Sequence, residues 1–383
     1  MIYLDNSATS YPKPECVIDA VYSSFHKFGA NSGRGAYKMA IDTTEQIYAC
    51  REKIAVFFNA DNVEKVIFTC NCTTALNMAI KGLAGVNSHF IISDLEHNAV
   101  LRPLETLKQK GVCDYSIARV SVDDYQTLKN FKNAIKPDTV AIICTGASNV
   151  FGIIPPYRLL SNLAHKNGLL FIMDCSQLAG VAPINMKKDN IDIICCAGHK
   201  GLMGPTGTGF MIINNDNIQL ASLIEGGTGS NSMSAIQPDI FPDKFESGTP
   251  NVQGIIGLST ALDFIKKKDI TKIYEHEYSL LKYLYKNLKN VDNVNLYTDF
   301  YNAKQNLTPI LSFNIKNMHS EEVADMLSDV GICVRAGLHC APLAHNKFGT
   351  QNTGTVRISP SIFTKKSDID FLIKSVIKIA KSK

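Results

Sequence analysis

The sequence predicts an α/β protein with a mostly parallel central sheet, helices on both faces and a smaller C-terminal α/β domain. Between about residues 60 and 215, short continuous apolar runs alternate with amphipathic segments of helical period. Continuous apolar runs are typical of strands buried on both faces, and their alternation with helices is typical of a parallel sheet. Near Gly254 the composition changes to long, lysine-rich amphipathic segments. This change predicts the start of the second domain.

The predicted elements alternate along the chain. Strands are expected over 66–69, 90–93, 139–144, 169–173, 191–196 and 210–213, with helices over 73–82, 98–111 and 157–168. The C-terminal part is expected to hold helices over 255–268, 270–288, 320–331 and 366–383 and strands over 311–315, 332–335 and 355–358. We divide the chain into a large domain, 13–258, and a small domain, 1–12 with 259–383. Pro12 and Pro14 mark the exit of an N-terminal segment that is expected to pack beside the C-terminal part.

The composition excludes several classes of function. The 383 residues carry a net charge of +4 without a basic block and interleaved aromatics, so no nucleic-acid binding is expected. No run of about 18 apolar residues and no leader pattern occurs, so we expect no membrane span and a cytoplasmic protein. The 11 cysteines are an odd number without zinc-ligand spacing, so no metal site is expected and most are interpreted as small buried hydrophobic residues.

Lys200 and Asp174 together indicate the chemistry. Lys200 follows the apolar strand 191–196 and a glycine, where a lysine can lie against the sheet. Most lysines in glycine-rich loops lie at the surface, but Asp174 ends the preceding apolar strand. Pyridoxal 5'-phosphate (PLP) needs both groups, because a lysine amine binds its aldehyde and a carboxylate keeps its ring nitrogen protonated. The pair therefore predicts PLP as the cofactor.

Three loops that follow strands place polar residues at the same edge of the sheet. Cys72 and Thr73 open a helix, where free backbone amides favour an anion, although an ordinary helix cap has the same pattern. His97 can stack on a flat cofactor or transfer a proton, or it is a hydrogen-bonded loop histidine. Asn149 can donate to a ring oxygen or form an Asx turn.

Three residues further along the chain each have a functional and a structural interpretation. Thr249 lies in a turn before a helix and is either a phosphate donor or the start of that helix. Cys340 shares a loop with a glycine, a cation and a histidine, and neighbouring positive charge favours a nucleophilic thiolate. Its alternative is a half-buried loop cysteine. Arg357 either binds a substrate carboxylate or forms a surface ion pair.

Five motifs carry a resemblance that covers essentially the whole chain. They are Tyr3-Leu4-Asp5-Asn6-Ser7-Ala8-Thr9, Asp174-Cys175-Ser176-Gln177, Gly198-His199-Lys200, Glu246-Ser247-Gly248-Thr249-Pro250-Asn251 and Arg335-Ala336-Gly337-Leu338-His339-Cys340. Together they resemble the cysteine desulfurases and selenocysteine lyases of the class V aminotransferase group of PLP enzymes. The short loop around Cys340 resembles the Suf-type branch. The resemblance implies the PLP-dependent transferase fold type I and a homodimer with active sites at the subunit interface.

The resemblance also implies a role for each site residue. Lys200 is the Schiff-base lysine, Asp174 pairs with the pyridine nitrogen, and Cys340 takes the sulfur. The other implied roles are contacts to the cofactor ring (Gln177 and His97), phosphate binding (Thr73, His199 and, from the other subunit, Thr249) and binding of the substrate carboxylate (Asn149 and Arg357). Arg34 matches a segment that lines the neighbouring subunit's site.

The implied reaction converts L-cysteine to L-alanine and passes sulfur as a persulfide to Cys340, then to an acceptor protein. Iron–sulfur cluster assembly, tRNA thiolation and selenium metabolism all stay open as its destination. The alternatives are a selenocysteine-selective lyase, another class V aminotransferase-type enzyme, or a non-catalytic protein of the same fold. Two positions depart from the family pattern. Ala197 replaces a hydroxyl residue, which removes a hydrogen bond worth about 0.5–1.5 kcal/mol, and Tyr37 stands where relatives often have histidine.

Overall fold

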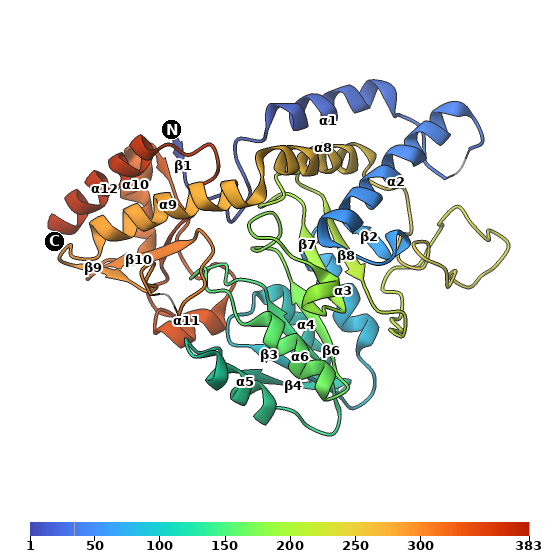
Figure 1. Cartoon of the computed structure of the whole chain (residues 1–383), viewed down its shortest axis with the longest axis horizontal. Helices are drawn as coiled ribbons and strands as arrows, with labels where there is room; N and C mark the ends of the chain where they lie inside the picture. The colour runs from blue at the N-terminus through green and yellow to red at the C-terminus, as the bar shows by residue number, and fades with distance from the viewer. Residues whose placement is uncertain (34, 303, 383) are drawn as a thin grey trace.

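A seven-stranded sheet forms the centre of the computed structural model, which describes residues 1–33, 35–302 and 304–382 (Figure 1). Its strand order is β2-β8-β7-β6-β5-β3-β4. β8 is antiparallel to both of its neighbours, and the other pairs are parallel, which confirms the mostly parallel sheet. The strands are β2 (Val66–Thr69), β3 (Ser88–Ser93), β4 (Cys113–Ala118), β5 (Thr139–Thr145), β6 (Leu170–Asp174), β7 (Ile193–Ala197) and β8 (Gly209–Ile213).

Helices cover both faces of this sheet because its inner strands are apolar on both sides. Phe90 and Ile91, neighbours in β3, are buried in two different hydrophobic cores. One core includes α3 (Cys72–Leu83) and α4 (Asn98–Gln109). The other includes residues of α2 (Lys38–Phe58), α5 (Asp124–Asn133), α6 (Tyr157–Lys166) and α8 (Val252–Lys268). In Figure 1, α1 (Glu15–Lys27) lies beside α8 along the upper side of the molecule. The short helices η1 (Val63–Lys65) and α7 (Met186–Asp189) complete this part.

Several elements of the structure were not predicted from the sequence, among them α1, α2, β4 and α5. β4 pairs with β3 at the edge of the described sheet, and Tyr115 to Ile117 within it are partly or fully exposed. An edge strand needs no continuous apolar run, because solvent reaches it from one side. α5 is rich in polar residues and buries only Thr127 and Phe131. Both elements therefore lack the pattern on which the sequence prediction depends.

The C-terminal part has a smaller antiparallel sheet of its own, in the order β12-β10-β9. It shares a hydrophobic core with three helices, in which Leu284, Phe313 and Leu372 are fully buried. The elements are α9 (Ile270–Leu288), β9 (Val294–Leu296), β10 (Leu311–Ile315), α10 (Ser320–Asp329), β11 (Ile332–Cys333), α11 (Pro342–Phe348), β12 (Val356–Ile358) and α12 (Lys366–Lys381). The predicted second α/β unit is thus present as a packed body.

The N-terminal segment packs against this part, as predicted. β1 (Ile2–Tyr3) pairs in parallel with β11, and Asn6 Nδ2 donates to the Ser359 carbonyl at 2.9 Å. Residue 258 lies within α8, so the division of the chain at that position stays a prediction. None of the helices in the described ranges has the length and apolarity needed to cross a lipid bilayer.

Candidate active site

One pocket lies where β5, β6 and β7 end and where α3 and α4 begin. Ligands in open α/β sheets bind at such carboxyl ends, because the loops there leave backbone groups and side chains free. Eight residues predicted from the sequence line this pocket: Cys72, Thr73, His97, Asn149, Asp174, Gln177, His199 and Lys200. Residues that are distant in sequence therefore surround a single cavity.

Asp174 is the last residue of β6 and is almost completely buried. Its Oδ1 accepts hydrogen bonds from the Ser176 amide at 2.8 Å and from the Cys72 thiol at 3.4 Å. These donors hold the carboxylate in a fixed orientation at the pocket. Cys72 thus contributes a side chain as well as its place in the first turn of α3. Burial and the charge of Asp174 raise the pKa of the Cys72 thiol well above its ordinary value, so it stays a neutral donor.

Lys200 follows a tight turn after β7. Gly198 is required in this turn, because a Cβ there would lie 2.2 Å from Thr208 Oγ1. Burial lowers the pKa of the Lys200 ammonium, and the negative charge of Asp174 acts in the opposite direction. A lysine with a lowered pKa loses its proton more readily and becomes a nucleophilic amine.

Two histidines line the pocket in neutral form. His97 caps α4, and its Nδ1 accepts from the Ala99 amide at 3.0 Å, so its proton resides on Nε2. Burial lowers the pKa of His97. Burial and the charges of Lys200 and Lys13 lower the pKa of His199 to about 4. Each neutral ring carries one donor and one acceptor nitrogen, and His97, whose acceptor is bound to the Ala99 amide, offers its Nε2 donor to the pocket.

Cys340 does not line the pocket, but its loop is bound to residues that do. Its carbonyl accepts from the Asn98 amide at 2.7 Å, next to His97, and the His339 carbonyl accepts from Asn149 Nδ2 at 2.7 Å. His339 and Cys340 both adopt left-handed backbone conformations, with φ of 50° and 57°. The Cys340 side chain is exposed. The loop therefore holds an accessible thiol beside the N-terminus of α4.

Arg357 is buried behind the pocket rather than exposed at the surface. Its Nη2 pairs with Asp5 Oδ1 at 2.6 Å, and its Nη1 donates to the Asn149 carbonyl at 2.9 Å. Its Nε has no partner among the described residues. Arg357 is thus joined to the pocket through Asn149.

Among the described residues, one predicted site residue, Thr249, lies at a different pocket. Thr249 is exposed and lines a separate pocket beside Met78 and Phe245, where its hydroxyl accepts from Asn31 Nδ2 at 3.2 Å. Arg34 lies outside the described residues. Their implied roles at a neighbouring subunit's site stay predictions.

The model of the class-V aminotransferase family matches residues 2–372. The chain belongs to the class-V aminotransferase family. Among its relatives in this family, a "probable cysteine desulfurase" of Methanothermobacter thermautotrophicus is 31% identical, over 99% of this chain and 94% of that protein.

Solved structures of cysteine desulfurases also resemble this class-V aminotransferase family member. An apo structure from Thermococcus onnurineus has a TM-score of 0.89 and 28% identity, covering 100% of this chain and 95% of that one. CsdA from Escherichia coli has a TM-score of 0.86 and 27% identity, covering 99% and 94%. The predicted fold type I architecture is confirmed by these matches.

Class-V aminotransferases and cysteine desulfurases depend on PLP in general, and the pocket residues fit that group. Asn149 Oδ1 is buried without a partner in the described chain, so it offers an acceptor where a donor was expected from the sequence. A ring hydroxyl supplies the matching donor. In the first turn of α3, the Thr74 amide is capped by Asn71 Oδ1 at 2.9 Å. The amides of Cys72 and Thr73, which precede it, remain suited to a phosphate.

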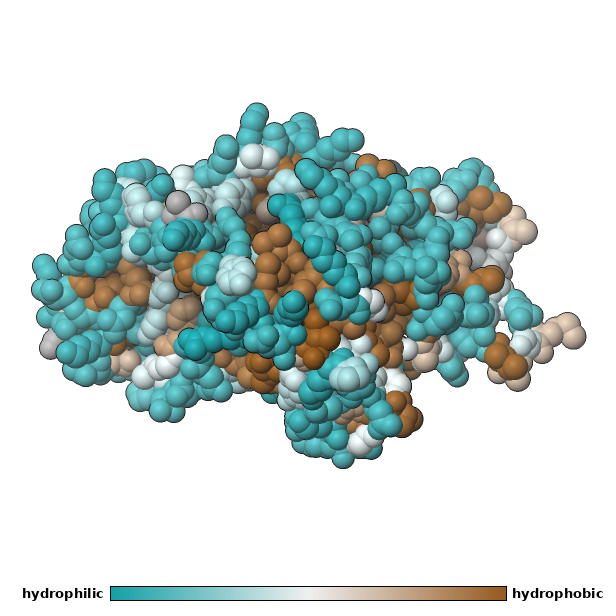
Figure 2. All heavy atoms as spheres, turned by 60° about the horizontal axis from the view of Figure 1, so that its bottom comes forward, coloured by the Kyte–Doolittle hydropathy of each residue, from teal (hydrophilic) through white to brown (hydrophobic). Residues whose placement is uncertain are grey.

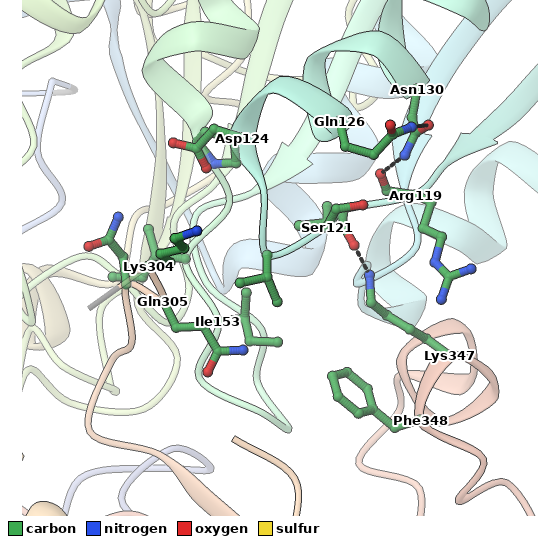
Figure 3. Close-up of a pocket in the computed structure, with 15 residues that line it drawn as sticks. Arg119, Ser121, Asp124, Gln126, Asn130, Ile153, Lys304, Gln305, Lys347 and Phe348 are labelled. Carbon is green, nitrogen blue, oxygen red and sulfur yellow. Dashed lines mark hydrogen bonds between the residues drawn. The ribbon is translucent and has the colours of Figure 1, made fainter. Parts of the chain in front are cut away.

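A larger groove of about 530 Å³ lies elsewhere, and none of the predicted site residues lines it (Figure 3). Arg119, Lys304 and Lys347 contribute cations, and the Lys347 ammonium is already bound to Asp94 and to the Val120 carbonyl. Asp124 also lines this groove, whereas the predicted pair of Lys200 and Asp174 lines the smaller pocket. The smaller pocket around Lys200 is therefore the candidate active site.

One buried group beside the site was missed in the sequence. Glu96, directly before His97, is fully buried, and its Oε1 accepts from the Thr145 amide at 2.7 Å and from the Ser93 hydroxyl. Burial raises the pKa of Glu96 to about 8, so its carboxyl group is mostly protonated at neutral pH. Glu96 stands in a loop of polar and charged residues, Asp94-Leu95-Glu96-His97-Asn98, so no local signal marked it as buried.

Proposed function

We propose that this protein is a PLP-dependent cysteine desulfurase that converts L-cysteine to L-alanine and takes the sulfur on Cys340. The observation that carries the proposal is the arrangement of Lys200 and Asp174 in one pocket, with the Cys340 loop hydrogen-bonded to the start of α4 beside it. The cysteine desulfurases among the relatives and the structural matches support it.

Each residue around the proposed cofactor has a separate role in binding or in proton transfer. PLP, when bound, supplies an aldehyde for an amine and a protonated ring that accepts electrons from the substrate α-carbon. Lys200 would hold the aldehyde through its amine and would carry the proton that leaves the substrate α-carbon. Asp174 keeps the ring nitrogen protonated, and its fixed Oδ1 leaves Oδ2 for that task. His97 and Gln177 hold the ring, and Thr73 and His199 hold the phosphate.

The sulfur step balances without an added oxidant. The Cys340 thiolate attacks the substrate sulfur, an S–S bond forms, and the C–S bond breaks with its electron pair remaining on carbon. That carbon takes up a proton, so alanine leaves and Cys340 carries a persulfide. Arg357 would orient the substrate carboxylate, and Asn149 would hold Arg357 in place through its carbonyl. Such positioning supplies much of the rate. An acceptor protein or a small thiol then takes the sulfur.

The protein is proposed to act as a homodimer. Thr249 lines a different pocket from Lys200, and the family resemblance implies that its phosphate contact is made in a second copy's site. Within the segment 214–251, a loop extends away from the body in Figure 1, and Met233 and Ile236 in this segment are exposed. Apolar side chains are also exposed on the face shown in Figure 2.

We propose a reducing compartment such as the cytoplasm for this protein. All 11 cysteines are free, which supports this location.

The first test is an absorbance spectrum of the purified protein with PLP, followed by addition of L-cysteine and a reducing thiol. We expect a visible band that changes on substrate addition, with alanine and sulfide formed in equal amounts. Lys200→Ala is expected to lose both the band and the products, because no amine remains to bind the aldehyde.

A protein that stays colourless with PLP would contradict the proposal. Sulfide without alanine would also contradict it. Activity on selenocysteine alone would instead support the selenocysteine-selective alternative.

A further inference from the structure

The carbonyl oxygen of His199, in the peptide that leads into Lys200, is surrounded by donors from the N-terminal segment. It accepts from the Ser10 amide at 3.0 Å, the Lys13 ammonium at 2.9 Å, and the hydroxyls of Ser10 and Thr9, each at 3.2 Å. The His199 ring is held by the same segment, since its Nδ1 lies 3.1 Å from Thr9 Oγ1. Residues 9–13 therefore fix both the backbone and the side chain of His199.

Lys13 differs from the other donors because it carries a charge. Its Nζ also donates to Ser10 Oγ at 2.7 Å, and no ion pair joins it to a carboxylate within the described residues. Burial lowers the pKa of this ammonium to about 8. A partly buried cation with only neutral partners is costly unless an anion lies nearby. The positive charge of Lys13 acts on the His199 ring and helps to lower the pKa of that imidazole.

The His199 ring lines the pocket together with Thr73 and the first turn of α3. These are the groups best suited to an anion, and Ala197 in the same pocket has no hydroxyl to add. We propose that Lys13 is a positioning residue of the cofactor site: its ammonium holds the His199–Lys200 peptide and supplies positive charge for the phosphate of PLP. This inference rests on the proposed function and goes beyond it, because it assigns part of the phosphate affinity to the N-terminal segment.

The test compares two aldehydes that differ only in the phosphate, PLP and pyridoxal. Dissociation constants are measured by equilibrium dialysis for the full-length wild type, Lys13→Gln, Lys13→Arg and the control Lys53→Gln. Lys53 forms an exposed ion pair with Asp263 and has no contact with the pocket. We expect Lys13→Gln to weaken PLP binding about tenfold or more, as loss of a charged hydrogen bond does. Binding of pyridoxal is expected to weaken much less, because Thr9 and Ser10 still donate to the His199 carbonyl, and Lys13→Arg is expected to restore most of the PLP affinity.

The outcomes separate a charge effect from a structural one. If Lys13→Gln weakens PLP and pyridoxal equally, or weakens neither, Lys13 does not act on the phosphate and the inference is overturned. Thermal unfolding of each variant shows whether the fold is retained, and a misfolded Lys13→Gln is replaced by Lys13→Met in the same comparison. A wild type that binds neither aldehyde would overturn the proposed function as well, whereas wild-type binding with an unaffected Lys13→Gln overturns this inference alone.

Discussion

At the scale of single residues, exposure separates the cysteines that can react from those that cannot. Cys72, Cys144, Cys195 and Cys196 are buried, and burial raises the pKa of each thiol well above its ordinary value. A thiol reacts as its thiolate, so these cysteines are inert at neutral pH. Cys340 is exposed and lies in a loop bound to Asn98 and Asn149. Cys16 and Cys70 are exposed as well, but the contacts of the Cys340 loop with Asn98 and Asn149 make Cys340 the proposed sulfur acceptor.

Cys340→Ala tests this assignment. We expect the variant to keep the absorbance of bound PLP, because Cys340 does not line the pocket, and to release sulfide from L-cysteine only at the rate of a blank without enzyme. Selenide release from selenocysteine is expected to continue, since selenium leaves carbon more easily. Cys16→Ala is the matched control, because Cys16 is also exposed and is expected to have full activity. Sulfide release by Cys340→Ala at the wild-type rate would show that another group accepts the sulfur.

At the scale of elements, a buried ion pair joins α2 to the segment that carries Thr249. Arg51 on α2 binds Glu246 through two parallel hydrogen bonds, at 2.7 and 2.8 Å, and its guanidinium lies 4.7 Å from the centre of the Phe68 ring. Glu246 Oε1 also accepts from the Phe68 amide at 2.7 Å. The pair thus fixes α2, β2 and the 245–251 turn against one another.

We expect Glu246→Gln to lower the free energy of unfolding by about 3 kcal/mol, because it leaves the buried Arg51 charge with neutral acceptors such as the Val66 carbonyl and without a charged partner. α2 supplies a matched control: Lys53 pairs with Asp263 at the surface, with side-chain exposures of 40% and 58%. Asp263→Asn is expected to change stability by less than about 1 kcal/mol. The measurement is urea unfolding of both variants. Equal effects at the two positions would show that burial does not govern the Arg51–Glu246 pair.

At the scale of the whole molecule, Glu277 marks a junction between distant parts of the chain. It lies on α9, faces a small cavity with Ser7, Lys200 and Ser361, and is almost fully buried. Burial raises the pKa of its carboxyl group to about 8, from an ordinary value of 4.5. The folded protein therefore binds a proton here at a pH where the unfolded chain does not. This contribution to stability is present at low pH and is lost as the pH rises through 8.

Glu277→Gln is expected to remove this dependence. Between pH 5 and 8, the variant should gain stability over the wild type by up to about 1.4 kcal/mol per pH unit as the pH rises. Urea unfolding of both proteins across that range gives the difference. A stability difference that is the same at every pH would mean that Glu277 titrates normally and that its burial is compensated by other groups.

Much of the fold and the centre of the site could be predicted from the sequence. Buried parallel strands have continuous apolar runs, so β5, β6 and β7 could be predicted from contiguous sequence. The residues that follow these strands could be predicted to lie at their ends. Because the carboxyl ends of parallel strands meet at one edge, Asp174 and Lys200 were predicted to lie together, and both line one pocket. The edge strand β4 and the polar helix α5 were missed. Both are partly exposed to solvent, so their sequences need no apolar pattern.

The sequence by itself determined which strand ends carry the lysine and the carboxylate. A buried strand is visible as an apolar run, and the polar residue that follows its end is next to it in the sequence. Only the tertiary structure decided which distant segments complete the site. It brings the Cys340 carbonyl to the Asn98 amide, Arg357 to the Asn149 carbonyl, and Lys13 to the His199 carbonyl. These contacts depend on how the N-terminal and C-terminal parts pack against the central sheet. No local sequence pattern predicts that packing, because each residue in these contacts, taken alone, looks like an ordinary polar residue.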